Sequence, residues 1–165
     1  MGDRKDGHEV VSILNDLIEI CDDGAAGFRT AAEEIRQPEA RTMFIERARR
    51  IDQSKVELAD LVRRLGGAPV EHGHATAGLH RGWMNLKAAV TGKDDEAILV
   101  EVERGEEIAV THYRDALNAD LPADVRMVVQ AQARGAEMNL TRVQTLRRSQ
   151  PPATGGVRAT GDLRP

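Results

Sequence analysis

Four long segments of the chain repeat apolar residues at intervals of three and four, and this period constrains the fold more than any other feature. In the first segment, residues 8–36, the repeat runs through Val10, Leu14, Leu17, Cys21, Gly24, Phe28, Ala31 and Ile35. Such spacing places these side chains on one face of an α-helix. Asp6 and Glu9 are spaced as an N-terminal capping box. We expect Gly24 and Gly27 to let a neighbouring helix approach closely, rather than to form a hinge.

The same reasoning predicts three more long helices. One covers residues 38–66, because a proline suits its first turn and a glycine pair suits its end. Another opens at residue 94, ends before the joint at residues 120–122, and begins with three acids, which suit the positive end of a helix dipole. The last runs over residues 121–149. Between the second and third, residues 67–93 read as a loop followed by a short helix, and no segment has convincing strand alternation.

The lengths of the connections select an architecture. Short joints at residue 37 and at residues 120–122 make two antiparallel helical hairpins, whereas the middle connection is long enough to travel the length of a bundle. We therefore predict an all-α, ferritin-like four-helix bundle whose long crossover contains a short helix. The alternative is an up-down bundle with an extra peripheral helix. Residues 1–149 would form this domain, and residues 150–165, with three prolines and three glycines, a disordered tail.

Composition excludes several classes of protein. Aromatic residues make up 2% of the chain and the net charge is −4, which argues against a base-stacking nucleic-acid surface. No apolar run approaches the roughly 18 residues of a membrane span, and no hydrophobic stretch follows the first residues as in a secretory signal. Cys21 is the single cysteine, so no internal disulfide can form. We expect a cytoplasmic protein with no nucleic-acid partner and no membrane span.

Six short motifs stand out along residues 8–148: Leu14-Asn15-Asp16-Leu17-Ile18-Glu19, Cys21 with Asp23-Gly24, Gly27-Phe28 followed by Ala31-Ala32-Glu33, Arg64-Leu65-Gly66-Gly67, His80-Arg81-Gly82-Trp83, and Glu101-Val102-Glu103-Arg104-Gly105-Glu106. In this order they resemble an uncharacterised bacterial family of the ferritin-like group, described as a four-helix-bundle domain of unknown function. The resemblance implies the fold and carries no established activity.

The wider ferritin-like group implies a di-iron centre, whose ligands are a Glu from each of two helices and a Glu-x-x-His from each of the other two. The long helices predicted here contain no Glu-x-x-His. Glu137 is followed three residues later by Leu140, and Glu103 by Glu106. Glu19 falls about 180° from the apolar stripe of its helix. We therefore expect no cofactor, with iron or manganese held by other ligands as the alternative.

Polar residues nevertheless fall on the buried faces of three of the helices: Arg47, Glu106, Gln132 and Asn139. They could form a polar layer through the middle of the bundle. We interpret the layer as an Arg47–Glu106 ion pair whose leftover donors the two amides satisfy, because a buried charge must be paired. The alternative is a variant ion site around Glu106.

The crossover holds a second group of candidates. Glu71, His72 and His74 lie in a loop and are weak candidates for metal binding, with solvated histidines as the simpler interpretation. In the motif His80-Arg81-Gly82-Trp83, we expect Trp83 to anchor the crossover helix and Gly82 to let it lie close.

These observations favour a bundle without enzyme activity that acts by binding or by self-association, as in a homo-oligomer. Cys21 lies on a buried stripe, where a thiol behaves as a small hydrophobe. One rival is a metal-binding protein or di-iron-type oxidoreductase with unusual ligands around Glu106. A second rival is a stress-related partner of membranes or nucleic acid, whose only support is the arginine-rich stretch 41–64, where acids alternate with the arginines.

Overall fold

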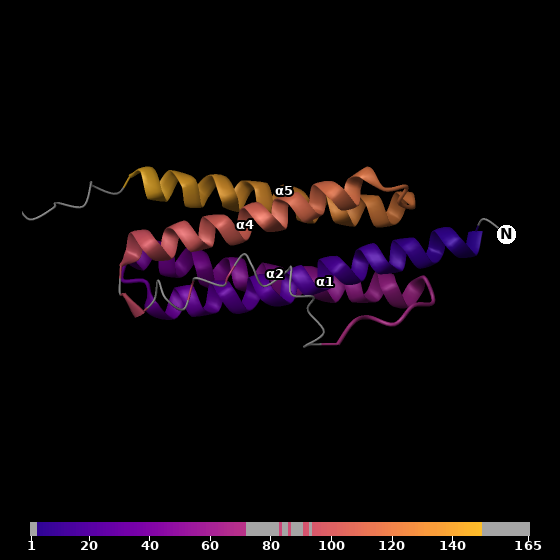
Figure 1. The fold of residues 1–165 in the computed structure, drawn as a ribbon, viewed down its shortest axis with the longest axis horizontal. Helices are drawn as coiled ribbons and strands as arrows, with labels where there is room; N and C mark the ends of the chain where they lie inside the picture. The colour runs from indigo at the N-terminus through magenta and orange to yellow at the C-terminus, as the bar shows by residue number, and fades with distance from the viewer. Residues whose placement is uncertain (1–2, 72–82, 84–85, 87–90, 93, 150–165) are drawn as a thin grey trace, which may run out of the picture.

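The computed structural model describes residues 3–71, 83, 86, 91–92 and 94–149 (Figure 1). Within them lie four long helices, which are α1 (Asp3–Glu34), α2 (Pro38–Arg64), α4 (Asp95–Asn118) and α5 (Ala123–Arg148). No strand occurs in this part of the chain. The all-α prediction is confirmed. The predicted tail and most of the predicted short helix lie outside the described residues.

The helix ends follow local sequence with one exception. Gly66 has a φ of 78°, which a glycine adopts without a Cβ clash, and the Gly67 N–H closes α2 by donating to the Val62 carbonyl at 2.9 Å. The Asp94 carboxylate caps α4 by accepting from the Glu96 N–H at 3.1 Å. The predicted cap of α1 is wrong, because that helix begins at Asp3 and already includes Asp6. Good helix-forming residues before Asp6 extend the helix past it.

The segment between the two hairpins crosses the whole bundle. At one end, Asn15 of α1 fixes the chain after α2, since its amide donates to the Ala68 carbonyl at 3.1 Å and accepts from the Val70 N–H at 2.8 Å. At the other end, the Asp95 carboxylate accepts the Arg36 N–H at 3.1 Å. Asn15 and Arg36 are about 30 Å apart along α1. The crossover of the ferritin-like prediction is therefore confirmed, and α2 and α4 run in the same direction (Figure 1).

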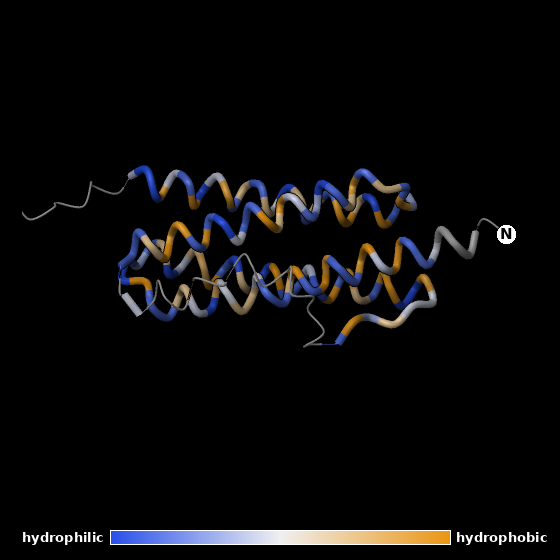
Figure 2. The backbone as a smooth tube through the Cα atoms, in the orientation of Figure 1, coloured by the Kyte–Doolittle hydropathy of each residue, from blue (hydrophilic) through white to orange (hydrophobic). Residues whose placement is uncertain are grey.

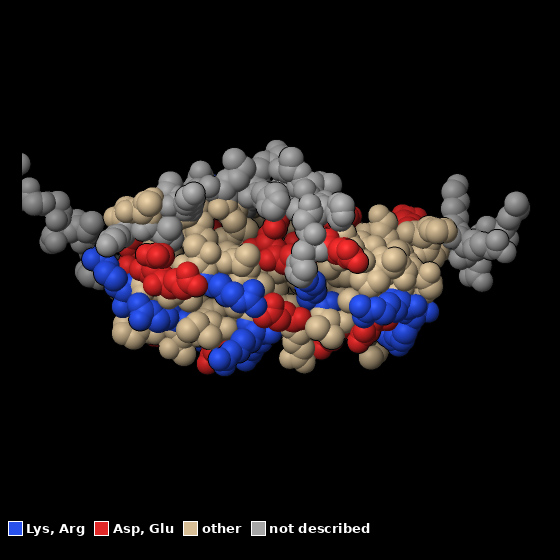
Figure 3. Space-filling model, turned by 90° about the horizontal axis from the view of Figure 1, so that it is seen from below, with Lys and Arg blue, Asp and Glu red and all other residues tan. Residues whose placement is uncertain are grey.

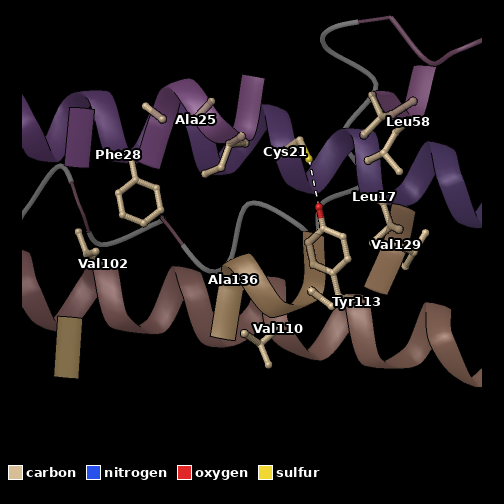
Figure 4. Close-up of a cluster of buried hydrophobic side chains, with 14 of the residues drawn as sticks. Leu17, Cys21, Ala25, Phe28, Leu58, Val102, Val110, Tyr113, Val129 and Ala136 are labelled. Atoms are coloured by element: carbon tan, nitrogen blue, oxygen red, sulfur yellow. Dashed lines mark hydrogen bonds between the residues drawn. The ribbon is translucent and has the colours of Figure 1, made fainter. Parts of the chain in front are cut away.

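The core is built from aliphatic and small residues contributed by all four helices. Apolar and polar residues alternate along each helix in Figure 2, as expected for helices with one buried face. Phe28 lies fully buried near the middle and makes edge-to-face contacts with Phe44, at 5.7 Å between ring centroids, and with Trp83, at 5.4 Å. Figure 4 shows small side chains such as Ala25 and Ala136 in the same buried cluster as the larger Phe28 and Tyr113.

Two further features describe the exterior. None of the described helices is long and apolar enough to cross a membrane. On the face drawn in Figure 3, basic and acidic side chains are interspersed. Ion pairs at the surface join α1 to α2, as between Arg29 and Asp52. Neither sign of charge covers this face alone (Figure 3).

Candidate functional site

An ion pair lies in the middle of the bundle between Arg47 of α2 and Glu106 of α4. Arg47 Nη2 is 2.6 Å from Glu106 Oε1, and the two side chains are 8% and 2% exposed. Both residues occur on apolar rows of their helices, so the helical period carries them into the core together with Phe44 and Val102. A buried carboxylate without a cation would be strongly destabilising, and Arg47 supplies that cation.

The environment of Glu106 is only partly compensated. Burial raises the pKa of Glu106 from 4.5 to about 7, while the Arg47 cation and the Asn139 amide on α5 lower it in part. Among the residues that the structure describes, the buried Arg47 Nε has no hydrogen-bond partner. The ion pair is thus close in distance, but its hydrogen-bonding capacity is incompletely used.

A small cavity lies beside this ion pair. It has a volume of about 20 Å³ and is lined by polar groups of Cys21, Asp23 and Tyr113 as well as by the ion pair itself. This volume is enough for about one water molecule, and the polar lining suits one.

Gln132 lies in a different hydrogen-bonded cluster. The Tyr113 hydroxyl donates to Gln132 Oε1 at 3.0 Å, and Gln132 Nε2 donates to Glu57 Oε2 at 2.9 Å and to the Ser54 carbonyl at 3.2 Å. The Cys21 sulfur is 3.6 Å from the Tyr113 oxygen (Figure 4). The four residues predicted to form one layer therefore divide, with Arg47, Glu106 and Asn139 at one level and Gln132 about 10 Å along α5.

Sequence reasoning missed the role of Tyr113 in this second cluster. A signal was available, because a tyrosine on a buried face must find a partner for its hydroxyl. Burial raises the pKa of the Cys21 thiol to about 11, which leaves it protonated and unreactive at neutral pH.

The residues at the bundle centre do not fit a di-iron centre. Within the described part of the chain, no group of three His, Cys, Asp or Glu side chains is arranged to hold a metal ion. The carboxylate of Glu106 is instead paired with the permanently charged guanidinium of Arg47, so its charge is neutralised by a side chain and not by a metal ion. Of the weak metal candidates in the crossover, Glu71 is exposed, whereas His72 and His74 lie outside the described residues.

The crossover motif can be followed at one residue. Trp83 lies between α1 and α4 at two glycines, since a Cβ built on Gly27 would lie 2.3 Å from its indole and one on Gly105 would lie 2.4 Å away. Gly24 instead faces the Ile51 side chain of α2 at an ordinary 3.5 Å. The close neighbour of Gly27 is thus the indole of the crossover, not a long helix. His80, Arg81 and Gly82 lie outside the described residues.

Two antiparallel hairpins joined by a full-length crossover, with a small aliphatic core, define a ferritin-like four-helix bundle. A family model described as Domain of unknown function (DUF2383) matches residues 9–119, and the chain belongs to this family. No curated protein matches the chain in sequence.

Solved structures share the fold. A mutant of Dps1 from Mycobacterium smegmatis is 15% identical, with a TM-score of 0.68 over 87% of this chain and 97% of the other. The tetragonal form of Mycobacterium smegmatis Dps is also 15% identical, with a TM-score of 0.68 over 86% of this chain and 87% of the other. At this identity, the likeness shows the fold alone.

Proposed function

We propose that this protein is a ferritin-like bundle without catalytic metal, which acts by binding or by self-association. The observation that carries the proposal is the buried Arg47–Glu106 pair. A guanidinium remains charged at every physiological pH, so it repels a cation brought to the neighbouring carboxylate. The buried thiol of Cys21 offers no alternative nucleophile, and it suits a reducing cytoplasm.

Metal analysis tests the first part of this proposal. Untagged protein is produced with added iron and manganese, and the metal content per chain is measured by elemental analysis. We expect substoichiometric metal that does not respond to Glu106→Gln. Glu107→Gln is the matched control, because Glu107 is the exposed neighbour of Glu106 on α4. At least one iron or manganese per chain that disappears only in Glu106→Gln would establish the rival reading, a metal protein with unusual ligands.

Self-association is tested separately. Large apolar side chains project from α2 and α5, with Val56 60%, Met127 69% and Met138 66% exposed. Exposed apolar side chains mark an interaction surface where they form a contiguous patch, so these three are the residues to test. Light scattering across a range of protein concentrations should give a mass above that of one chain. A single-chain mass at every concentration would remove self-association and leave only binding to another partner.

A further inference from the structure

The packing between α2 and α5 leaves a second cavity, on the other side of Arg47 from the water-sized one. These two helices touch less than any other pair of neighbours in the bundle. The cavity between them has a volume of about 50 Å³. Its polar lining comes from Glu46, Arg47 and Arg50 of α2 and from Asn139 and Arg142 of α5.

The lining is rich in positive charge. Glu106 offsets the charge of Arg47, which leaves Arg50 and Arg142 against the single carboxylate of Glu46. Both Arg50 and Arg142 are exposed. Neither forms an ion pair among the residues that the structure describes. Two uncompensated guanidinium groups therefore reach the same opening from opposite helices.

A buried cation also lines the cavity. Arg47 lies 7% exposed, and its Nε has no hydrogen-bond partner among the residues that the structure describes. Arg47 Nη1 lies 3.9 Å from where a Cβ on Gly135 would be, and Gly135 lines the same cavity, so the guanidinium extends from Glu106 to the α2–α5 cavity. The Arg47 guanidinium therefore presents a charged donor to an acceptor in the cavity.

We propose that the cavity between α2 and α5 binds a small free oxyanion, such as phosphate, sulfate or a small carboxylate. Guanidinium groups match the oxygens of such anions with paired, charge-assisted hydrogen bonds. The volume suits a group of a few heavy atoms. Met43, which is buried, and Met138, which is exposed, supply the apolar part of the lining. This inference deepens the proposed binding role, since it names the chemical class of a ligand.

Calorimetric titration of the full chain with sulfate, at constant ionic strength, tests the site. Sulfate is chosen because its charge does not change near neutral pH. The double variant Arg50→Gln/Arg142→Gln removes the two rim cations, and its affinity should fall about tenfold or more. The matched control Arg49→Gln/Arg134→Gln removes the same charge from exposed arginines of α2 and α5 outside the cavity, and its affinity should change less than about twofold. No saturable binding, or an equal loss in both pairs, would overturn the site.

A second variant tests the buried part of the site. Glu106→Gln removes the carboxylate that neutralises Arg47, and circular dichroism verifies that it folds. Sulfate should then bind severalfold more tightly, because the Arg47 cation is no longer offset. An unchanged or weaker affinity in the folded variant would show that Arg47 is not part of the site.

The outcomes for the two proposals are distinct. Absent sulfate binding in protein that also lacks metal overturns the oxyanion site and leaves the non-catalytic function intact. Stoichiometric metal lost in Glu106→Gln overturns the proposed function, whatever the sulfate titration gives.

Discussion

Gly105→Ala is the sharpest test of how the crossover is anchored. A Cβ at this position would lie 2.4 Å from the Cε2 and Cζ2 atoms of Trp83, closer by about 1 Å than an ordinary carbon contact. Neither the glycine backbone of α4 nor a rigid indole can yield by a small rotation, so Trp83 must leave its position. Its edge-to-face contact with Phe28 would be lost with it.

Two opposing effects set how much Gly105→Ala changes the free energy of unfolding. Replacing a glycine inside a helix by alanine stabilises that helix by about 1 kcal/mol. Overpacking of a core costs about 1–3 kcal/mol, and the lost aromatic contact about 0.5–1.5 kcal/mol more. We therefore expect Gly105→Ala to lower the free energy of unfolding by about 0.5–3.5 kcal/mol. Gly24→Ala is the matched control, because its Cβ would meet only Ile51 at 3.5 Å, and it should be neutral or stabilising.

Urea denaturation followed by circular dichroism measures both variants. Trp83 is the chain's single tryptophan, so its emission reports directly on the displaced side chain. Its emission should shift to longer wavelength in Gly105→Ala and stay unchanged in Gly24→Ala. In a Trp83→Leu background, Gly105→Ala should lower the free energy of unfolding much less than it does in the natural chain. If Gly105→Ala stabilises the protein as Gly24→Ala does, with unchanged emission, the indole does not lie between Gly27 and Gly105 and the reasoning is refuted.

Three further predictions concern the polar core, and all use urea denaturation. Arg47→Met leaves Glu106 buried without its cation and should lower the free energy of unfolding by about 3–5 kcal/mol at pH 8. Adding Glu106→Leu should restore most of that loss. A loss below about 1 kcal/mol would contradict the buried ion pair. The pKa of Glu106 is about 7 in the folded chain against an ordinary 4.5, so the unfolded chain ionises first as pH rises. Stability from this group should therefore fall by about 3 kcal/mol between pH 4.5 and pH 7 and then level, and Glu106→Gln should abolish that fall; equal pH profiles for the two proteins would refute the raised pKa. Tyr113→Phe removes the hydrogen bond to Gln132 and should cost about 1–3 kcal/mol, since a buried acceptor loses its partner; an unchanged midpoint would show that water replaces the hydroxyl.

The helices and the crossover could be predicted because they depend on local period and on connection length. The Arg47–Glu106 pairing followed from the same source, since two opposite charges carried inward by the helical period must meet. The level of each residue along the bundle axis could not be predicted from the period alone. That is why Gln132 was grouped with Asn139, although seven residues of helix separate them.

The role of Trp83 as an anchor could be predicted, but the helices that it contacts could not. The sequence indicates that an indole in the crossover should anchor it, and that Gly27 marks a close approach. It does not indicate which segment comes close, because apolar period defines a face but not the partner that covers it. Gly105 lies on α4, far from Gly27 in sequence, and only the folded arrangement brings both to the same ring.

The contact of Asp95 with the α1–α2 turn has a consequence for the order of folding. Its carboxylate accepts the backbone N–H groups of Arg36 and Gln37, 59 and 58 residues earlier in the chain. Each helical hairpin forms through contacts that are close in sequence, so it can form rapidly. The Asp95 contact instead joins the two hairpins, and it can form only after they have come together across the long connection. The joining of the two hairpins should therefore be the slow step. Asp95→Ala should then accelerate unfolding more than it slows folding, because the contact forms after the rate-limiting barrier.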